Sequence, residues 1–216
     1  MSGKVQEAPV DLALVLAVDV SGSISNERLT MQIEGYAEAI VSPAFAHAVA
    51  GLANGHLALT YLAWSSASTQ IPIVPWRAIV GAASAAEFAS ALRAAPRPGL
   101  GFTSISGALD RAASELAAFA GRAGRRVIDI SGDGINNDGR PVAAARDAAV
   151  AAGITINGLP IVEIDPNLDA YFRAEVIGGA VAFLVVARDA SSLAQAIQRK
   201  LITEIADRAA PPASPA

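Results

Sequence analysis

The chain has 216 residues, a formal net charge of −4 at pH 7, and a composition that is 53% hydrophobic. Its acidic balance disfavours a nucleic acid as the partner, and the lack of cysteine excludes disulfides, thiolate metal sites and thiol catalysis. No apolar run approaches the roughly 18 to 20 residues that a membrane-spanning helix needs, so we predict no membrane span.

Length and composition indicate a single domain with two short ends of different character. We expect an N-terminal extension over residues 1–9, one domain over residues 10–208, and a flexible tail rich in proline and alanine over residues 209–216. The first residues lack the apolar core of a signal peptide. A basic cluster at residues 122–126 is expected at a helix end, where cations suit the helix dipole.

Strand and helix patterns alternate along the chain. The predicted strands are residues 11–18, 56–64, 69–76, 126–131, 154–161 and 180–187. The predicted helices are residues 25–41, 84–95, 105–120, 141–152, 167–176 and 190–207. Right-handed crossovers between such strands produce an α/β fold, doubly wound, with a mainly parallel six-stranded sheet and helices on both faces. Pro72 and Pro75 cannot donate to a strand ladder, so their strand belongs at a sheet edge.

The first strand ends in a group of oxygen-bearing side chains. Leu12 to Val18 is a continuous apolar run, typical of a central parallel strand that is buried on both faces. Asp19, Ser21 and Ser23 follow at once, at the carboxyl end where open α/β sheets bind ligands. Taken alone, this group is more typical of a turn that caps the next helix.

Two later segments strengthen the ligand-binding interpretation. Thr103 lies in a loop just before a predicted helix, where by itself it is an N-cap candidate. Asp133 follows another predicted strand and lies between Gly132 and Gly134, which let the backbone turn sharply. Because the three loops can converge on one crevice, we interpret the combination as a site for a hard divalent cation.

This combination resembles the von Willebrand factor type A domain, whose metal-ion-dependent adhesion site joins an Asp-x-Ser-x-Ser loop, a threonine and a further aspartate. Matched singly, Asp19, Ser21 and Ser23 correspond to the first loop, Thr103 to the second and Asp133 to the third. The resemblance covers nearly the whole chain. It implies an antiparallel third strand at the edge of the sheet and a metal site formed by these five residues.

The last third of the chain carries a narrower likeness. Three segments are similar to an uncharacterised bacterial branch of these domains, described as a domain of unknown function: Asn157 to Ile161, Tyr171-Phe172, and Val176 to Ala180. Because members of that branch are often exported, the resemblance implies a periplasmic or exported location.

The donor types favour Mg²⁺, with Mn²⁺ and Ca²⁺ as alternatives. Mg²⁺ requires near-octahedral oxygen coordination and retains several waters. Hydroxyl ligands are neutral. If Ser21 and Ser23 bind directly while Asp19 and Asp133 act largely through water, the ion keeps much of its positive charge and attracts an acidic group. In the resembling family a ligand carboxylate is captured in this way. We therefore expect a non-enzymatic adhesion or assembly module whose partner is a protein that offers a carboxylate.

The residues leave two alternatives open. Residues 132–138 resemble the Gly-Asp-Gly-x-x-Asp loop of haloacid-dehalogenase-type phosphatases, in which Asp19 would be the nucleophile. That mechanism also needs an acid where this chain has Ser21, and a lysine, whereas the only lysines are Lys4 and Lys200. The other alternative is a structural module in which the cation only stabilises the loops.

Overall fold

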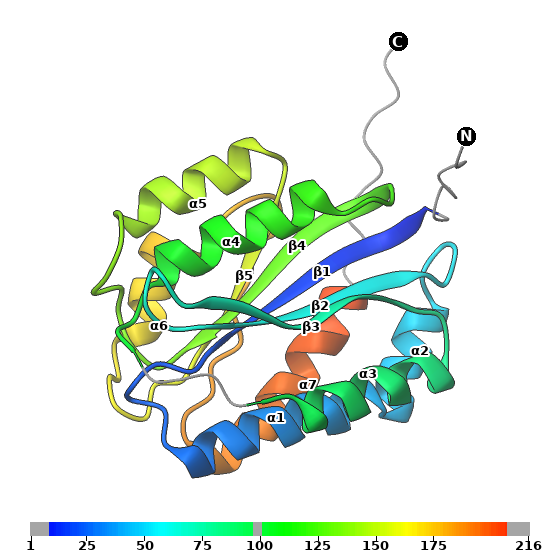
Figure 1. Ribbon diagram of the computed structural model, residues 1–216, viewed down its shortest axis with the longest axis horizontal. Helices are drawn as coiled ribbons and strands as arrows, with labels where there is room; N and C mark the ends of the chain where they lie inside the picture. The colour runs from blue at the N-terminus through cyan, green and yellow to red at the C-terminus, as the bar shows by residue number, and fades with distance from the viewer. Residues whose placement is uncertain (1–8, 97–100, 207–216) are drawn as a thin grey trace.

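A five-stranded sheet forms the centre of the computed structural model, which describes residues 9–96 and 101–206 (Figure 1). The strand order is β3-β2-β1-β4-β5, and every neighbouring pair is parallel except β2 and β3. The strands are β1 (Val10–Asp19), β2 (Leu57–Trp64), β3 (Gln70–Ile79), β4 (Ala123–Gly132) and β5 (Thr155–Pro160). The mainly parallel α/β sheet with one antiparallel strand confirms that part of the prediction.

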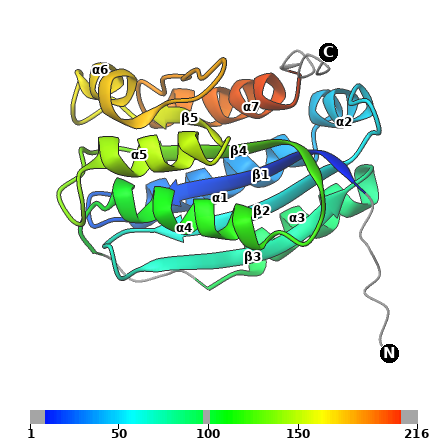
Figure 2. The ribbon, with the colours of Figure 1, turned by 90° about the horizontal axis from the view of Figure 1, so that it is seen from above.

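Helices cover both faces of this sheet (Figures 1 and 2). One face packs against α1, α2, α3 and α7, and the other against α4, α5 and α6 with its continuation η1. Their bounds are α1 (Asn26–Ile40), α2 (Pro43–Ala50), α3 (Ala82–Ala94), α4 (Ile105–Ala118), α5 (Val142–Ala151), α6 (Leu168–Tyr171), η1 (Phe172–Val176) and α7 (Ala190–Ala206). The predicted doubly wound layering is therefore present.

β1 lies at the middle of the core because its side chains are apolar on both faces. Successive strand residues point to opposite faces, and Leu12, Leu14 and Leu16 contribute to the cluster that includes α1 and α7. The smaller Ala13 and Ala17 contribute to the cluster that includes α4 and α5. Since both faces of β1 are covered, the polar residues that follow it leave the core at the carboxyl end of the strand.

β3 occupies the edge position that its prolines predicted. It pairs antiparallel with β2, and Pro72 lies opposite Leu62 in a register that shifts on either side of Tyr61. An edge strand tolerates Pro72 and Pro75 because one side of its backbone has no ladder to complete.

The prediction of a sixth strand over residues 180–187 was wrong in detail. This segment runs beside β5, where Val185 donates to the Gly158 carbonyl at 3.0 Å and Ala187 donates to the Pro160 carbonyl at 3.0 Å. Pairing is limited to isolated bridges. Pro160 has no N–H to return a bond, and Val181 at φ 54° departs from strand geometry. The segment covers the β5 edge without forming a regular strand.

The helix α2 was not predicted. Ser42 ends the preceding turn and its Oγ accepts the N–H of Phe45 at 3.2 Å, while Pro43 occupies the first turn of the helix. Both are typical helix-start features. The alanine-rich helix that follows is only two turns long.

α7 is joined to the sheet by a buried group of charges, here called the lysine cluster: Lys200, Asp129, Glu204 and Asn157. Lys200 Nζ lies 2.7 Å from Asp129 Oδ1 on β4 and 2.6 Å from Glu204 Oε1 on α7. The Asn157 amide on β5 donates to Glu204 Oε2 at 2.8 Å. The Lys200 side chain is only 1% exposed, so this helix contact is ionic as well as apolar.

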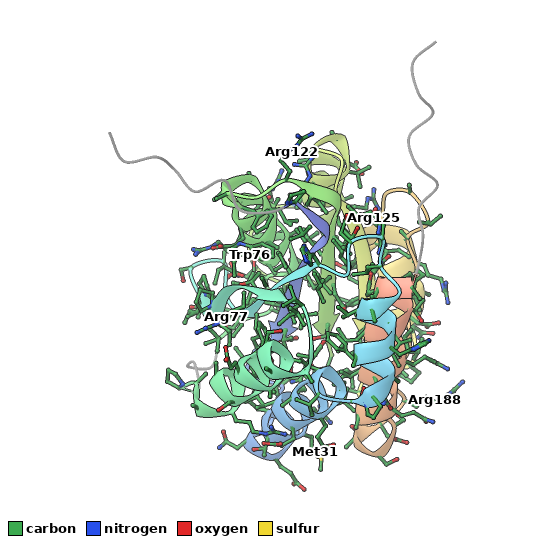
Figure 3. The ribbon with its side chains drawn as sticks, turned by 90° about the vertical axis from the view of Figure 1, so that its right-hand side faces the viewer. Met31, Trp76, Arg77, Arg122, Arg125 and Arg188 are labelled. Carbon is green, nitrogen blue, oxygen red and sulfur yellow. The ribbon has the colours of Figure 1, made fainter. Side chains whose placement is uncertain are left out.

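Figure 3 shows the end of the molecule where the parallel strands begin, with Arg122 and Arg125 near the start of β4. Arg125 donates to the carbonyl of Glu204 at 2.9 Å, in the last turn of α7. Arg126 donates to the carbonyl of Ala152, which caps α5, at 2.8 Å. Two of the three clustered arginines, although they lie on β4, therefore contact carbonyls at helix ends, as the prediction expected of the cluster.

The predicted N-terminal extension and C-terminal tail lie outside the described residues, apart from Pro9, and the described helices and strands all pack around one sheet. No helix in residues 9–96 or 101–206 is both long enough and apolar enough to span a membrane.

Candidate metal centre

The first loop of the candidate centre is built directly on the end of the central strand. Asp19 is the last residue of β1, and its Oδ1 accepts the backbone N–H of Ser21 at 2.7 Å. Val20 and Ile24 are buried and anchor the loop, whereas Ser23 between them is exposed. The Asp19 carboxylate therefore lies inside the protein, and the loop reaches the surface at Ser23.

Asp133 reaches the same place from β4. Ser23 Oγ donates to Asp133 Oδ1 at 2.5 Å, and the Oγ atoms of Ser21 and Ser23 are 3.3 Å apart. The Asp133 N–H lies 3.4 Å from Asp19 Oδ2. Gly132 permits this approach, because a Cβ there would lie 3.1 Å from Asp19 Oδ2. Four of the five predicted site residues thus form one connected group.

Thr103 is held next to this group by its main chain. Its N–H donates to Asn137 Oδ1 at 2.8 Å, and the Asn137 N–H donates back to the Thr103 carbonyl at 2.9 Å. The first loop joins the threonine loop where Gly22 donates to the Gly101 carbonyl at 2.9 Å. A Cβ on Gly134 would lie 3.8 Å from Thr103 Oγ1. All three predicted loops therefore meet at one end of the sheet.

The N-cap residue of α4 is Ser104. Thr103, which the sequence offered as an N-cap candidate, does not have that role. Ser104 Oγ accepts the N–H of Gly107 at 3.2 Å, as an N-cap does. Sequence reasoning missed the role of Asn136 and Asn137 in joining the loops, since Asn136 Oδ1 also accepts the Ser106 N–H at 3.0 Å. The signal was present as an asparagine pair soon after Asp133.

Burial disfavours the charged form of the Asp19 carboxyl. Burial raises the pKa of Asp19 from 3.8 to about 7, hydrogen bonds from Ser21 oppose the shift, and the nearby charge of Asp133 adds to it. Asp133 is also buried, with 2% of its surface exposed. Two carboxyls and neutral hydroxyls at one place are the hard oxygen donors that Mg²⁺ and Ca²⁺ use, so the donor set fits such an ion.

The group contains few of the residue types that hold transition metals. In the part of the chain that the structure describes, no cluster of three or more histidine, cysteine, aspartate or glutamate residues is placed to hold a metal ion. A cation at this end of the sheet would therefore depend on serine and threonine hydroxyls in addition to Asp19 and Asp133. We retain Asp19, Ser21, Ser23, Thr103 and Asp133 as predicted ligands.

An arginine that the sequence did not single out contacts the same group. Arg28 Nη1 lies 3.1 Å from Asp133 Oδ2, and its Nη2 lies 2.7 Å from Glu163 Oε2. Arg28 belongs to the first turn of α1, where a positive charge opposes the helix dipole. That unfavourable position was the available signal that Arg28 has another partner.

A family model described as "Protein of unknown function (DUF1194)" matches residues 9–209. The chain belongs to the DUF1194 family. This agrees with the expected uncharacterised branch of domains, and no curated protein matched the chain.

Solved structures show which fold this DUF1194 member has. The pilus adhesin SpaC from Lactobacillus rhamnosus GG is similar over 91% of this chain and 31% of its own, with 15% identity and a TM-score of 0.66. A von Willebrand factor type A protein from Catenulispora acidiphila is similar over 91% of this chain and 43% of its own, with 16% identity and a TM-score of 0.62.

One of the similar proteins is described with a bound metal. Proximal thread matrix protein 1 from the mussel byssus, described with a zinc-occupied MIDAS motif, is similar over 89% of this chain and 46% of its own, with 10% identity and a TM-score of 0.62. The DUF1194 chain spans less than half the length of each of these three proteins. At these identities the likeness establishes a shared von Willebrand factor type A fold.

Proposed function

We propose that this protein is a divalent-cation-dependent protein-binding module for adhesion or assembly. The observation that carries the proposal is the connected group of Asp19, Ser21, Ser23 and Asp133 at the carboxyl ends of β1 and β4. Thr103 completes the predicted ligand set. Mg²⁺ is the preferred ion, and Mn²⁺ and Ca²⁺ are alternatives with the same oxygen preference.

The chemistry of capture follows from charge. A divalent ion held by two carboxylates and neutral hydroxyls supplies an electrophilic position for an anionic oxygen of the partner. The buried backbone of β1 and the asparagine contacts keep the loops in place before the partner arrives, so little ordering is needed on binding. We propose that the partner is a protein that offers a carboxylate.

The structural comparisons support this role and a location outside the cytoplasm. The similar proteins include a pilus adhesin and a matrix protein of the mussel byssus. Both names denote adhesive or matrix material, and the byssus protein is described with zinc in its MIDAS motif. By analogy, we propose a periplasmic or exported location for this chain.

Calorimetry with metal alone tests the ion site. We expect Mg²⁺ and Mn²⁺ to bind one ion per chain of wild type, and Asp19→Asn to lose at least roughly tenfold in affinity because it removes a charged ligand. Asp110→Asn is the matched control, since Asp110 is an exposed aspartate that pairs with Arg140 on the surface. Equal heats for wild type and Asp19→Asn would remove the site from consideration.

Among the residues that the structure describes, the phosphatase alternative finds no accessible lysine near Asp133. Lys200 is enclosed in the lysine cluster with Asp129, which lies inside β4, whereas Asp133 follows the end of that strand. An aryl phosphate assay with Mg²⁺ provides the check. Turnover by wild type that Asp19→Asn abolishes would replace the binding proposal with an enzymatic one.

A purely structural cation would give a different pattern. Such an ion raises the melting temperature but creates no affinity for an acidic group, whereas a capture site shows both effects. Comparing the melting temperature with the binding of a small carboxylate, as described below, separates the two roles.

A further inference from the structure

Arg28 lies where an incoming acidic group would meet the candidate centre. Its side chain is 14% exposed and contacts Asp133, whose side chain is fully buried, and Glu163, whose side chain is 40% exposed. Arg28 therefore extends from a predicted metal ligand towards the surface. A guanidinium has five N–H donors, and these two contacts require one nitrogen each.

The charges of this region explain why an arginine is useful there. When ionised, Asp19, Asp133 and Glu163 carry three negative charges, and a divalent ion with Arg28 carries three positive ones. The loaded site is then neutral. Without Arg28 the charge of Glu163 would be unbalanced beside the ion and would oppose an incoming acidic group.

The loops that carry Thr103, Asp133 and Glu163 also carry exposed apolar side chains. Phe102, Ile135 and Ile164, here called the apolar rim, are 68%, 51% and 60% exposed. Phe102 adjoins Thr103, and Ile164 adjoins Glu163. Each rim residue thus lies within two positions of a residue of the candidate centre or of the Arg28 contact, on a different loop.

We propose that Arg28 and the apolar rim form the contact surface for the partner, and that the partner is a protein whose acidic side chain is flanked by apolar residues. This inference rests on the proposed function. The guanidinium supplies a second cation for the carboxylate, through N–H groups that the contacts to Asp133 and Glu163 do not use. The rim supplies apolar area whose burial stabilises the complex and excludes water from the charged contact.

The competing explanation is that Arg28 only positions Asp133. The two roles predict different effects of Arg28→Gln on metal affinity. If Arg28 only positions Asp133, Arg28→Gln weakens metal binding. If Arg28 contacts the partner, the same change leaves metal affinity unchanged or raises it, because a positive charge near the ion is removed, and the loss is confined to the carboxylate.

Small fluorinated probes measure these effects without an identified partner. We would load the protein with Mn²⁺ and follow ¹⁹F line broadening for fluoroacetate and for 4-fluorophenylacetate, which adds an apolar ring to the same acid. 4-Fluorobenzyl alcohol controls for apolar contact without charge. Calorimetry with Mn²⁺ gives metal affinity for each variant, and circular dichroism confirms folding.

The expected pattern separates Arg28 from the rim. Arg28→Gln lowers the affinity of both carboxylates roughly tenfold, because a charge-assisted hydrogen bond is lost. Phe102→Ser lowers the affinity of 4-fluorophenylacetate roughly threefold or more and leaves fluoroacetate unchanged. Arg111→Gln, which removes an exposed arginine paired with Glu115 on α4, changes neither.

Each failure has its own signature. If Mn²⁺ binds but neither carboxylate binds in a metal-dependent way, the proposed function fails. If both carboxylates bind equally well to wild type, Arg28→Gln and Phe102→Ser, the proposed function stands and this contact surface is wrong. A loss of Mn²⁺ affinity in Arg28→Gln would assign Arg28 the positioning role.

Discussion

Asp129 lies on β4, and Asp133 follows the end of that strand four residues later. The two carboxylates differ in the groups that surround them. Asp129 meets Lys200 at 2.7 Å inside the lysine cluster, where the cation is part of the chain. Asp133 is hydrogen-bonded to Asp19 and Ser23. Its Oδ2 contacts a cation of the chain, Arg28. One region is completed by the fold, whereas the other remains suited to an ion from outside.

The pKa shifts follow the same division. Burial raises the pKa of Asp129 and of Glu204, and the charge of Lys200 opposes both shifts. Burial lowers the pKa of Lys200, but the two carboxylates outweigh it and raise that pKa above its ordinary value. Asp19 has no such internal cation among the causes of its shift to a pKa of about 7. A buried carboxyl whose pKa is raised without an opposing cation of the chain is a candidate for a functional site.

The largest expected effect is on the lysine cluster. Lys200→Met should lower the free energy of unfolding by about 3 to 5 kcal/mol, because it leaves Asp129 and Glu204 buried without their cation. Urea denaturation measures the change. The triple variant with Asp129→Asn and Glu204→Gln should recover much of the loss, and a loss below about 1 kcal/mol for Lys200→Met would contradict the ionic role.

Metal should stabilise the other region by a smaller amount. At a free Mg²⁺ concentration of 100 times Kd, we expect the free energy of unfolding to rise by about 2.7 kcal/mol in wild type. Asp19→Asn should show little of this rise, measured by denaturation with Mg²⁺ or EDTA. The same increment in Lys200→Met would show that the two regions act independently, and a rise that survives Asp19→Asn would place the ion elsewhere.

Metal affinity should depend on pH through Asp19. Its pKa is raised to about 7 by burial, so below that pH the metal-free protein holds a proton that the ion must displace. Affinity should therefore rise about tenfold per pH unit up to pH 7 and level off above it. Calorimetry between pH 5.5 and 8.5, in buffers of different ionisation enthalpy, also counts the released proton. A flat profile would show that Asp19 is not a ligand.

The smallest effects should come from two asparagines that support the two regions. Asn157→Ala removes a donor to Glu204 and should cost about 1 to 2 kcal/mol of stability with no change in metal affinity. Asn137→Ala removes the acceptor for the Thr103 N–H and should lower metal affinity by a similar free energy. Denaturation and calorimetry on both variants provide the comparison, which fails if the two variants behave alike.

Local patterns predicted much of the candidate centre. The apolar run before Asp19 required a buried strand, and a buried strand must release its polar continuation at its end. Pro72 and Pro75 correctly placed β3 at an edge. The sixth strand was wrong because residues 180–187 are apolar but only partly buried, with Val181 61% exposed, and because Pro160 lacks the N–H that a regular ladder beside β5 requires.

The sequence by itself determined which strands end in oxygen-bearing side chains, because the nature and spacing of those residues are local properties. The tertiary structure decided which charges meet. Arg28 and Glu163 are 135 residues apart, and Asp129 and Lys200 come from a strand and a distant helix. Such pairs depend on the packing of whole layers. That packing brings a lysine to Asp129 and an arginine to Asp133 from residues far away in the chain.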